Sequence, residues 1–482
     1  MSHPQVLRIR SAWAKYRLMA TAHATKLWHS SLGRAAALTV ILTMACKLIG
    51  FFKEQVVASS IGVAGALDAF HVAALLPTLG INVILQNLSA SLVMTVVRER
   101  TIHGEDASRK MFAGAMFWGV LFSILFSMAV AWLGPVLLPV LSPGFTPELG
   151  RSASRMLWLL APYSAISGLT VFWSSLLNSE GRFVASAVSP GLISIAVAGC
   201  LLSAGGLSGV DALVLGLTLG AVLDLLNLGR SMHAQGLPLG PRYAGWTQTH
   251  SEILFMSLPL VAGTALHFGT EVVDQSMASM LGEGSISELK YGNRIVGMVF
   301  GVLSIPISQV VFPHLVRLVN EHKWAELQTL ARRSVLISFM ISVPATVALV
   351  VFSQQIVSLT FERGKFSPES AMQVAAVQAM YAFQLPFYLW GILMVRLAVA
   401  LRMNAAIFIG GCLNLSVNVA MNYVLMVPLG VTGIALSTAL VYVGAACYFS
   451  AAIRVALRRK IQDQLEIDKA SESEPQTSRL AA

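Results

Sequence analysis

Residues 36–97 read AALTVILTMACKLIGFFKEQVVASSIGVAGALDAFHVAALLPTLGINVILQNLSASLVMTVV, two long apolar runs separated by a short Gly-rich turn. Lys47 lies deep inside the first run, Lys53 and Glu54 follow near its far end, and Asp68 opens the second run. A Lys or Asp near the centre of a membrane-spanning helix costs roughly 2.5–3.5 kcal/mol on insertion scales, so such side chains usually face a protein interior or a water-filled cavity. Because Lys47 and Glu54 share one helical face, we expect this face to line a cavity.

Composition places the chain among polytopic membrane proteins. It has 482 residues, of which 56% are hydrophobic and only 12% are charged, and its mean hydropathy is +0.71. Soluble globular domains carry about 25% charged residues. Because about 20 apolar residues cross a bilayer as a helix, we predict an all-α fold with about 12 transmembrane helices. They cover, approximately, residues 36–58, 68–97, 111–133, 153–177, 183–204, 208–229, 252–280, 292–316, 333–353, 373–400, 404–426 and 431–453.

Charges outside these spans predict the topology. Loops on the same side as the N-terminus are rich in Arg and Lys, as at 98–110 and 454–460, whereas the turn at 59–67 on the other side holds none. Basic loops stay on the cytoplasmic side, so we expect both termini to be cytoplasmic. Residues 1–34 then form a basic arm on anionic lipid rather than a cleavable signal peptide. The polar segment from Ile461 onward is expected to be disordered.

Matching segments indicate an internal repeat. PGFTPE at 143–148 corresponds to GKFSPE at 364–369, 221 positions later, and three further pairs of segments align at nearly the same offset. Each half has an even number of predicted spans, so two six-helix bundles related by a parallel repeat are expected, which is a transporter layout. The predicted divisions are an arm at 1–34, an N-terminal bundle at 35–230, a cytoplasmic linker at 231–250, a C-terminal bundle at 251–455 and a tail at 456–482.

Five segments spread over about residues 36–455 carry a more specific signal. They read KLIGFFKEQVVASSIGVAGALDAFHVAALLP, SPGFTPE, LLNSEGRFVASAVSP, DQSMASMLGEGSISELKYGNRI and FERGKFSPE. Together they resemble the MurJ (MviN) lipid II flippase family of the multidrug/oligosaccharidyl-lipid/polysaccharide exporter superfamily. The resemblance implies a transporter rather than an enzyme. It would move an undecaprenyl-pyrophosphate-linked glycan precursor, lipid II or similar, across the bacterial cytoplasmic membrane by alternating access, for peptidoglycan and cell-wall synthesis.

The resemblance also implies a cationic cavity that holds the substrate pyrophosphate. The family's basic positions match Lys47, Lys53 and Arg294, and its acidic position in the DAF segment matches Asp68. Position alone allows other interpretations. Lys47 would then snorkel toward the interface, and Lys53 and Glu54 would form a local ion pair or an interfacial anchor. Asp68 would cap its own helix rather than act in gating against the cationic face, and Arg294 would be an interfacial residue.

Two carboxylates in the seventh predicted span indicate coupling to a cation. Glu271 and Asp274 are three residues apart and share a helix face. Two buried carboxylates are costly unless sodium or a proton neutralises them. The sodium ligands of the family match Asp274, Asn418, Asn422 and Thr438, which the resemblance therefore implies as ligands here. Hydrogen bonding between helices is the alternative role for the two Asn residues.

The chain departs from the family at several positions. Ile81 and Asn82 stand where the family has a basic pair, Gln86 replaces an acidic residue, and twelve spans are predicted where the family usually has fourteen. These departures favour, as an alternative, a flippase for exopolysaccharide or other lipid-linked oligosaccharide repeat units. A cation-coupled multidrug exporter is the second alternative, against which Lys47 and Arg294 argue. A non-transporting membrane scaffold is the third.

The sequence predicts neither enzymatic machinery nor a metal centre beyond a sodium site. It lacks GxGxxG, GxxxxGK[ST], HExxH and GxSxG, and its four cysteines lie in apolar runs without CxxC spacing. Cytoplasmic loops account for the net charge of +10, so no nucleic-acid partner is expected. The expected partners are the lipid-linked glycan, membrane lipids and enzymes of cell-wall or polysaccharide synthesis. We expect a monomer.

Overall fold

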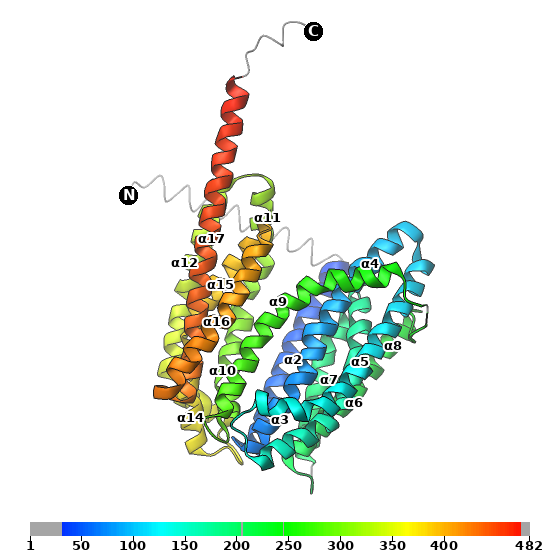
Figure 1. Ribbon diagram of the computed structural model, residues 1–482, viewed down its shortest axis with the longest axis vertical. Helices are drawn as coiled ribbons and strands as arrows, with labels where there is room; N and C mark the ends of the chain where they lie inside the picture. The colour runs from blue at the N-terminus through cyan, green and yellow to red at the C-terminus, as the bar shows by residue number, and fades with distance from the viewer. Residues whose placement is uncertain (1–30, 204–205, 244, 474–482) are drawn as a thin grey trace. The chain divides into compact units, whose positions relative to one another are not determined.

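The chain folds into long α-helices (Figure 1). This computed structural model describes residues 31–203, 206–243 and 245–473, and no β-strand occurs in those ranges. Most of the predicted basic arm lies outside them. The elements are α2 (Ser31–Ile61), α3 (Gly65–Thr78), η1 (Leu79–Leu85), α4 (Gln86–His103), α5 (Glu105–Leu141), α6 (Pro147–Ser179), α7 (Phe183–Leu202), α8 (Gly209–Ala234), α9 (Gln248–Ser279), α10 (Ser285–Leu303), η2 (Ile307–Val311), α11 (Phe312–Asn320), α12 (Trp324–Val351), α13 (Ser353–Phe361), α14 (Pro368–Ala382), α15 (Gln384–Ala400), α16 (Asn404–Leu429) and α17 (Val431–Ser473).

Eleven helical stretches among the described residues are long and apolar enough to cross a membrane. Each coincides with one of the predicted spans, and α2 falls on the remaining one. The prediction of an all-α polytopic membrane protein is therefore confirmed. A hydrocarbon environment favours this outcome because a helix satisfies its backbone hydrogen bonds within one segment.

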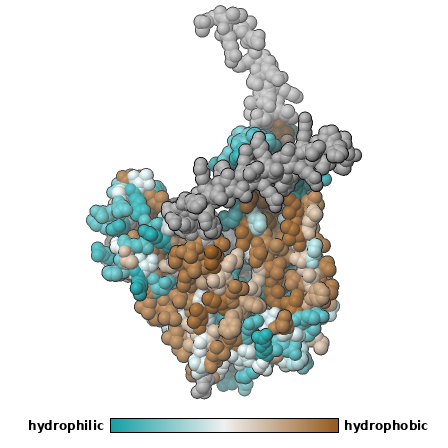
Figure 2. Space-filling view, turned by 180° about the vertical axis from the view of Figure 1, so that it is seen from behind, coloured by the Kyte–Doolittle hydropathy of each residue, from teal (hydrophilic) through white to brown (hydrophobic). Residues whose placement is uncertain are grey.

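Apolar side chains remain on the outside of these helices. On the face shown in Figure 2, hydrophobic residues cover the middle of the helices and hydrophilic residues gather toward the helix ends. Trp132, Val136 and Val140 on α5 are each 74% exposed. A soluble monomer rarely exposes an apolar surface of this extent, which is the surface that lipid chains would cover.

Two membrane helices contain a π-helical segment, and each of these segments follows a proline. Segment η1 begins shortly after Pro77, and η2 begins directly after Pro306. A proline removes one backbone donor and its ring clashes with the preceding turn, and π-helical turns absorb such disturbances. The chain nevertheless continues as one helical stretch in both places, from Gly65 to His103 and from Ser285 to Asn320.

The chain forms two compact units, each with its own core. Among the described residues, unit 1 contains 31–57 together with the described parts of Gly80–Ala129 and Leu159–Ser257. Its core includes Phe112, Met116 and Leu228, and α7 packs along α8. The predicted bundle divisions at 35–230 and 251–455 stay a prediction, since these units do not follow chain order.

Unit 2 contains Ala58–Leu79, Val130–Trp158 and the described residues 258–473. Its core includes Leu315, Leu327 and Leu393. Helix α17 packs against α15 and α16, and α10 packs against α14 (Figure 1). This unit contains most of the predicted site residues.

The polar tail differs from its expectation. Helix α17 (Val431–Ser473) continues through residues 461–473 of the segment expected to be disordered, and residues 474–482 lie outside the described ranges. Residues 461–473 contain no Pro or Gly, and about half of them (two Gln, two Glu, one Leu, one Lys and one Ala) are good helix formers. A helix already started in the membrane therefore propagates without a new nucleation cost.

Candidate functional site

A hydrogen-bonded cluster joins α9 to α16 around Asp274. Its carboxylate oxygen Oδ1 accepts hydrogen bonds from Asn418 Nδ2 at 2.9 Å and from Asn422 Nδ2 at 2.6 Å. The hydroxyl of Ser437 on α17 donates in turn to Asn422 Oδ1. Three of the four residues expected as sodium ligands are thus in direct contact. The alternative role, hydrogen bonding between helices by the two Asn residues, is also present.

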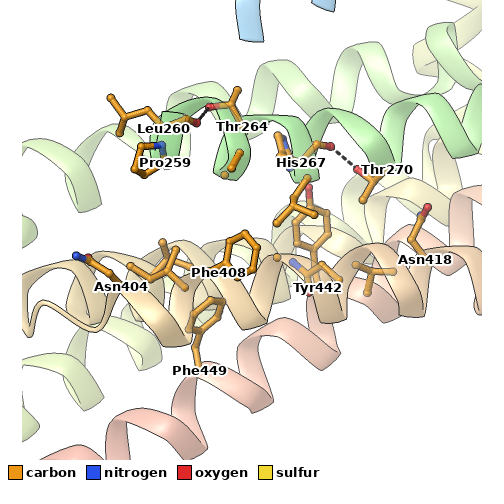
Figure 3. A pocket seen from close by; sticks show the side chains of 18 of the residues that line it. Pro259, Leu260, Thr264, His267, Thr270, Asn404, Phe408, Asn418, Tyr442 and Phe449 are labelled. Atoms are coloured by element: carbon orange, nitrogen blue, oxygen red, sulfur yellow. Dashed lines mark hydrogen bonds between the residues drawn. The ribbon is translucent and has the colours of Figure 1, made fainter. Parts of the chain in front are cut away.

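A cavity of about 790 Å³ opens beside this cluster between α9, α16 and α17. Figure 3 shows α9 on one side, with Thr264, His267 and Thr270, and α16 with Phe408 and Asn418 facing it. The other expected ligand, Thr438, also lines the cavity, as do the following polar residues: Asp274, Asn414 and Tyr442. Apolar side chains also line the cavity, among them Leu260 and Phe408.

The oxygen atoms of this cluster suit a hard cation. Asn418 Oδ1 is buried and has no hydrogen-bond partner among the described residues, so it retains an unused lone pair beside the Asp274 carboxylate. Carboxylate and amide oxygens are preferred by hard cations, whereas His and Cys are preferred by transition metals. Within the ranges that the structure describes, no group of three His, Cys, Asp or Glu residues could hold a metal ion. The residues present fit sodium better than a transition metal.

Glu271 departs from its expected environment. It is exposed at 46% of its side chain and forms an ion pair with Lys290 of α10. Its Oε1 also accepts a hydrogen bond from Gln275 Nε2 at 3.2 Å. The expectation of two buried carboxylates is therefore wrong for Glu271, because a lysine from the neighbouring helix neutralises it at the surface. Only Asp274 is enclosed by neutral partners.

Asp68 is fully buried and caps a helix other than its own. Its carboxylate accepts hydrogen bonds from the Gly284 amide at 2.6 Å, the Ser287 amide at 2.8 Å and the Ser287 hydroxyl at 2.5 Å. These amides belong to the start of α10, where Gly284 has φ of +92°. The positive end of a helix dipole stabilises a carboxylate. Asp68 lies in the first turn of its own helix α3, as the alternative required, but its carboxylate bonds to the amides of α10 and not to those of α3.

The cations expected to bind substrate lie in different surroundings. In unit 1, Lys47 is exposed on α2, and none of the described residues pairs with it. Lys53 Nζ lies 2.7 Å from a carboxylate oxygen of Glu54, which confirms the local ion pair proposed as its alternative. In unit 2, Arg294 is exposed on α10, one helical turn after Lys290. The substrate-binding role of these residues stays a prediction.

Several residues of these clusters, and one outside them, were not predicted from the sequence. Ser437, Ser287 and Lys290 take part through their contacts, and no spacing in the sequence singles them out. Asp224 on α8 is another, since it is only 5% exposed and lies among the hydroxyls of Thr170 and Ser189. A carboxylate inside a predicted span was the signal that could have identified Asp224.

The profile of the family described as "Lipid II flippase MurJ" matches residues 57–474 of this chain. A protein of Rhizobium meliloti named "Probable lipid II flippase MurJ" is 28% identical over 358 residues, which are 72% of this chain and 66% of that protein. A protein of the same name from Synechocystis sp. is 26% identical over 427 residues, 85% of this chain and 79% of that protein. This chain therefore spans about two thirds to four fifths of the length of these relatives.

Solved structures share the fold. The structure "Lipid II flippase MurJ, inward closed conformation" has a TM-score of 0.76 and 19% sequence identity, covering 89% of this chain and 91% of that chain. An inward-facing multidrug resistance MATE family transporter of the MOP superfamily has a TM-score of 0.69 and 14% identity, covering 89% of this chain and 99% of that chain. At these identities the structures establish the architecture, and the family profile establishes the relationship.

Proposed function

Since the chain belongs to the lipid II flippase MurJ family, we propose that it moves a lipid-linked glycan precursor, lipid II or a close analogue, across the bacterial cytoplasmic membrane. Members of this family are transporters, and the many apolar helices make this chain a multi-pass membrane protein. Flipping breaks no covalent bond, so the chain has to hold a charged head group and exclude it from hydrocarbon. A hydrolytic centre is not required.

The observation that carries this proposal is the family match together with cations inside membrane helices. Lys47 lies within α2 and Arg294 within α10, and both are exposed. A charged side chain within a span is costly and usually lines a water-filled path. Lysine and arginine bind phosphate oxygens through charge-assisted hydrogen bonds. A pyrophosphate-linked substrate is the ligand class that such cations fit, whereas an exporter of organic cations would need the opposite charge.

We propose further that sodium binds at Asp274 and is coupled to transport. Asp274, Asn418, Asn422 and Thr438 would hold the ion, with the unpaired Asn418 Oδ1 as an available ligand. A bound cation would neutralise the Asp274 carboxylate within the membrane and tighten the contact between α9 and α16. Asp274→Asn should abolish the dependence of transport on sodium while the purified protein still unfolds cooperatively. Sodium dependence that is unchanged in Asp274→Asn would exclude this site.

The flippase proposal is tested with the purified chain in lipid vesicles that contain fluorescent lipid II. The measured quantity is the rate at which lipid II on the inner leaflet becomes accessible to an impermeant reagent. We expect transport by the native chain and a rate about 10-fold lower for Lys47→Ala, the effect of losing about 1.4 kcal/mol of phosphate binding. Lys323→Ala, outside the spans, is the matched control and should keep the native rate.

Alternative substrates give a different result in the same vesicles. If lipid II is not moved but an undecaprenyl-linked polysaccharide repeat unit is, the chain serves another polymer. If neither is moved while an organic cation is, the flippase proposal is wrong.

The topology and partners also belong to this proposal. Both termini would be cytoplasmic, because the basic loops at 98–110 and 454–460 then lie inside. Enzymes of cell-wall or polysaccharide synthesis would supply the substrate, and a monomer would suffice. A single cysteine placed in the tail and labelled by an impermeant reagent in intact cells would contradict the orientation.

A further inference from the structure

Helix α10 presents two cations one turn apart. Lys290 and Arg294 are four residues apart, and side chains at this spacing lie on the same helix face with Cβ atoms about 5–6 Å from each other. Arg294 is exposed, and the Lys290 side chain is 35% exposed. Of these two cations of α10, the substrate role proposed above includes only Arg294. Lys290 is occupied by an ion pair with Glu271 of α9.

This ion pair is suited to exchange. Both side chains are more than one third exposed, and water screens a pair of this kind so strongly that it contributes little to stability. Neither group is enclosed as Asp68 is, whose carboxylate has no exposed surface. An anion with more charge than one carboxylate could therefore replace Glu271 on Lys290 without disturbing the fold.

Glu271 also connects to the cation site. It lies one turn before Asp274 on α9, and its Oε1 accepts a hydrogen bond from the buried Gln275 at 3.2 Å. While Lys290 is paired with Glu271, the charges of the two side chains cancel near Asp274. Once Lys290 leaves, an uncompensated negative charge remains beside Asp274, and this charge favours a cation there.

We propose that Lys290 is an exchangeable phosphate-binding residue, which Glu271 holds in the absence of substrate and which the substrate pyrophosphate takes over together with Arg294. Lysine supplies a compact charge with three donors, and arginine supplies a planar fork, so the two together fit the two phosphates of a pyrophosphate. The released Glu271 strengthens cation binding at Asp274. This inference rests on the proposed function. The Lys290–Glu271 pair would couple the binding of pyrophosphate to the binding of the cation.

Coupling of this kind is reciprocal. If pyrophosphate raises the affinity for sodium, sodium raises the affinity for pyrophosphate by the same factor. Coupling between two sites on one protein typically changes affinity by about 5- to 150-fold, and we expect about 10-fold here because the released charge stays partly exposed to solvent.

The test measures sodium binding to the purified full chain, with and without inorganic pyrophosphate added as a sodium-free salt. In the native chain, pyrophosphate should raise sodium affinity about 10-fold. Lys290→Gln should bind pyrophosphate about 10-fold more weakly, bind sodium tightly without it, and show no coupling. Glu271→Gln should bind pyrophosphate more tightly, because Lys290 is then free, and should also show no coupling.

A matched control exists in the same unit. Lys323 pairs with Glu321 at 2.8 Å, with side-chain exposures of 47% and 36%. Lys323→Gln removes a comparable pair and should behave as the native chain does. Misfolding cannot produce the gain in pyrophosphate affinity that is expected for Glu271→Gln. The pyrophosphate affinity of this variant therefore still tests the proposal if Lys290→Gln is unstable.

The outcomes separate this inference from the proposed function. Suppose that the native chain flips lipid II and binds pyrophosphate, but pyrophosphate still raises the sodium affinity of both variants as it does that of the native chain. Lys290 and Glu271 then do not couple the two ligands, and the inference is overturned. If the native chain neither flips lipid II nor binds pyrophosphate, the proposed function fails and the inference fails with it.

Discussion

Replacing Asp68 should loosen the start of α10 and reduce stability more than any ordinary helix cap would. The buried carboxylate is the acceptor for the amides of Gly284 and Ser287 and for the Ser287 hydroxyl. In Asp68→Ala these donors lose their acceptor in a site without solvent. Each unsatisfied buried amide costs about 1–3 kcal/mol.

The expected loss is about 3 kcal/mol of unfolding free energy for Asp68→Ala, since removal of a buried charge offsets part of the cost of the unsatisfied donors. Asp68→Asn keeps one acceptor oxygen but turns an amino group toward the remaining donors, so we expect a loss of about 1–2 kcal/mol. Ser367 caps α14 at the surface, where its hydroxyl accepts from the Ser370 amide at 3.1 Å. Ser367→Ala should cost only about 1 kcal/mol.

The assay is unfolding of the purified protein in mixed micelles by a denaturing detergent, followed by circular dichroism. Asp68→Ala should unfold at a clearly lower detergent fraction than Ser367→Ala, and Asp68→Asn should fall between Asp68→Ala and the native chain. Lipid II transport should fall in the same order, because the first turn of α10 positions Lys290 and Arg294. If Asp68→Ala is no less stable than Ser367→Ala, the carboxylate does not support α10 and this reasoning is refuted.

Two further predictions concern a glycine and a lysine. Gly364 has φ of +60°, and a Cβ there would overlap the backbone carbonyl of Ser59. Gly364→Ala should therefore cost well above the roughly 1–2 kcal/mol expected for Gly236→Ala, whose φ of +63° is nearly the same but whose surroundings are open; equal thermal unfolding midpoints would contradict this. Lys47 pairs with none of the described residues, so Lys47→Ala should change the free energy of unfolding by less than about 0.5 kcal/mol, and a larger loss in the same detergent titration would assign it a structural role.

The membrane fold could be predicted from the sequence because it depends on local properties. A run of apolar residues long enough to cross a bilayer has to form a helix there, and the predicted spans match the helices of the structure. The repeated motifs are equally local: PGFTPE and GKFSPE both place a proline at the first residue of a helix, Pro147 in α6 and Pro368 in α14. The prediction of disorder was wrong for residues 461–473, because polarity alone does not distinguish a solvated helix from a disordered tail.

The partners of each charged side chain were decided only by the tertiary structure. Glu271 and Asp274 are three residues apart and look equivalent in the sequence, yet one pairs with Lys290 at the surface and the other lies among Asn418 and Asn422. Asp68 lies in the first turn of α3 and caps α10, more than two hundred residues later. Hydropathy and spacing report on a single helix, whereas the energy of a charge in a membrane depends on the groups that the neighbouring helices bring to it. The sequence by itself therefore determined where helices form and which of them carry charges, and helix packing decided which charges are neutralised and which remain available for a ligand.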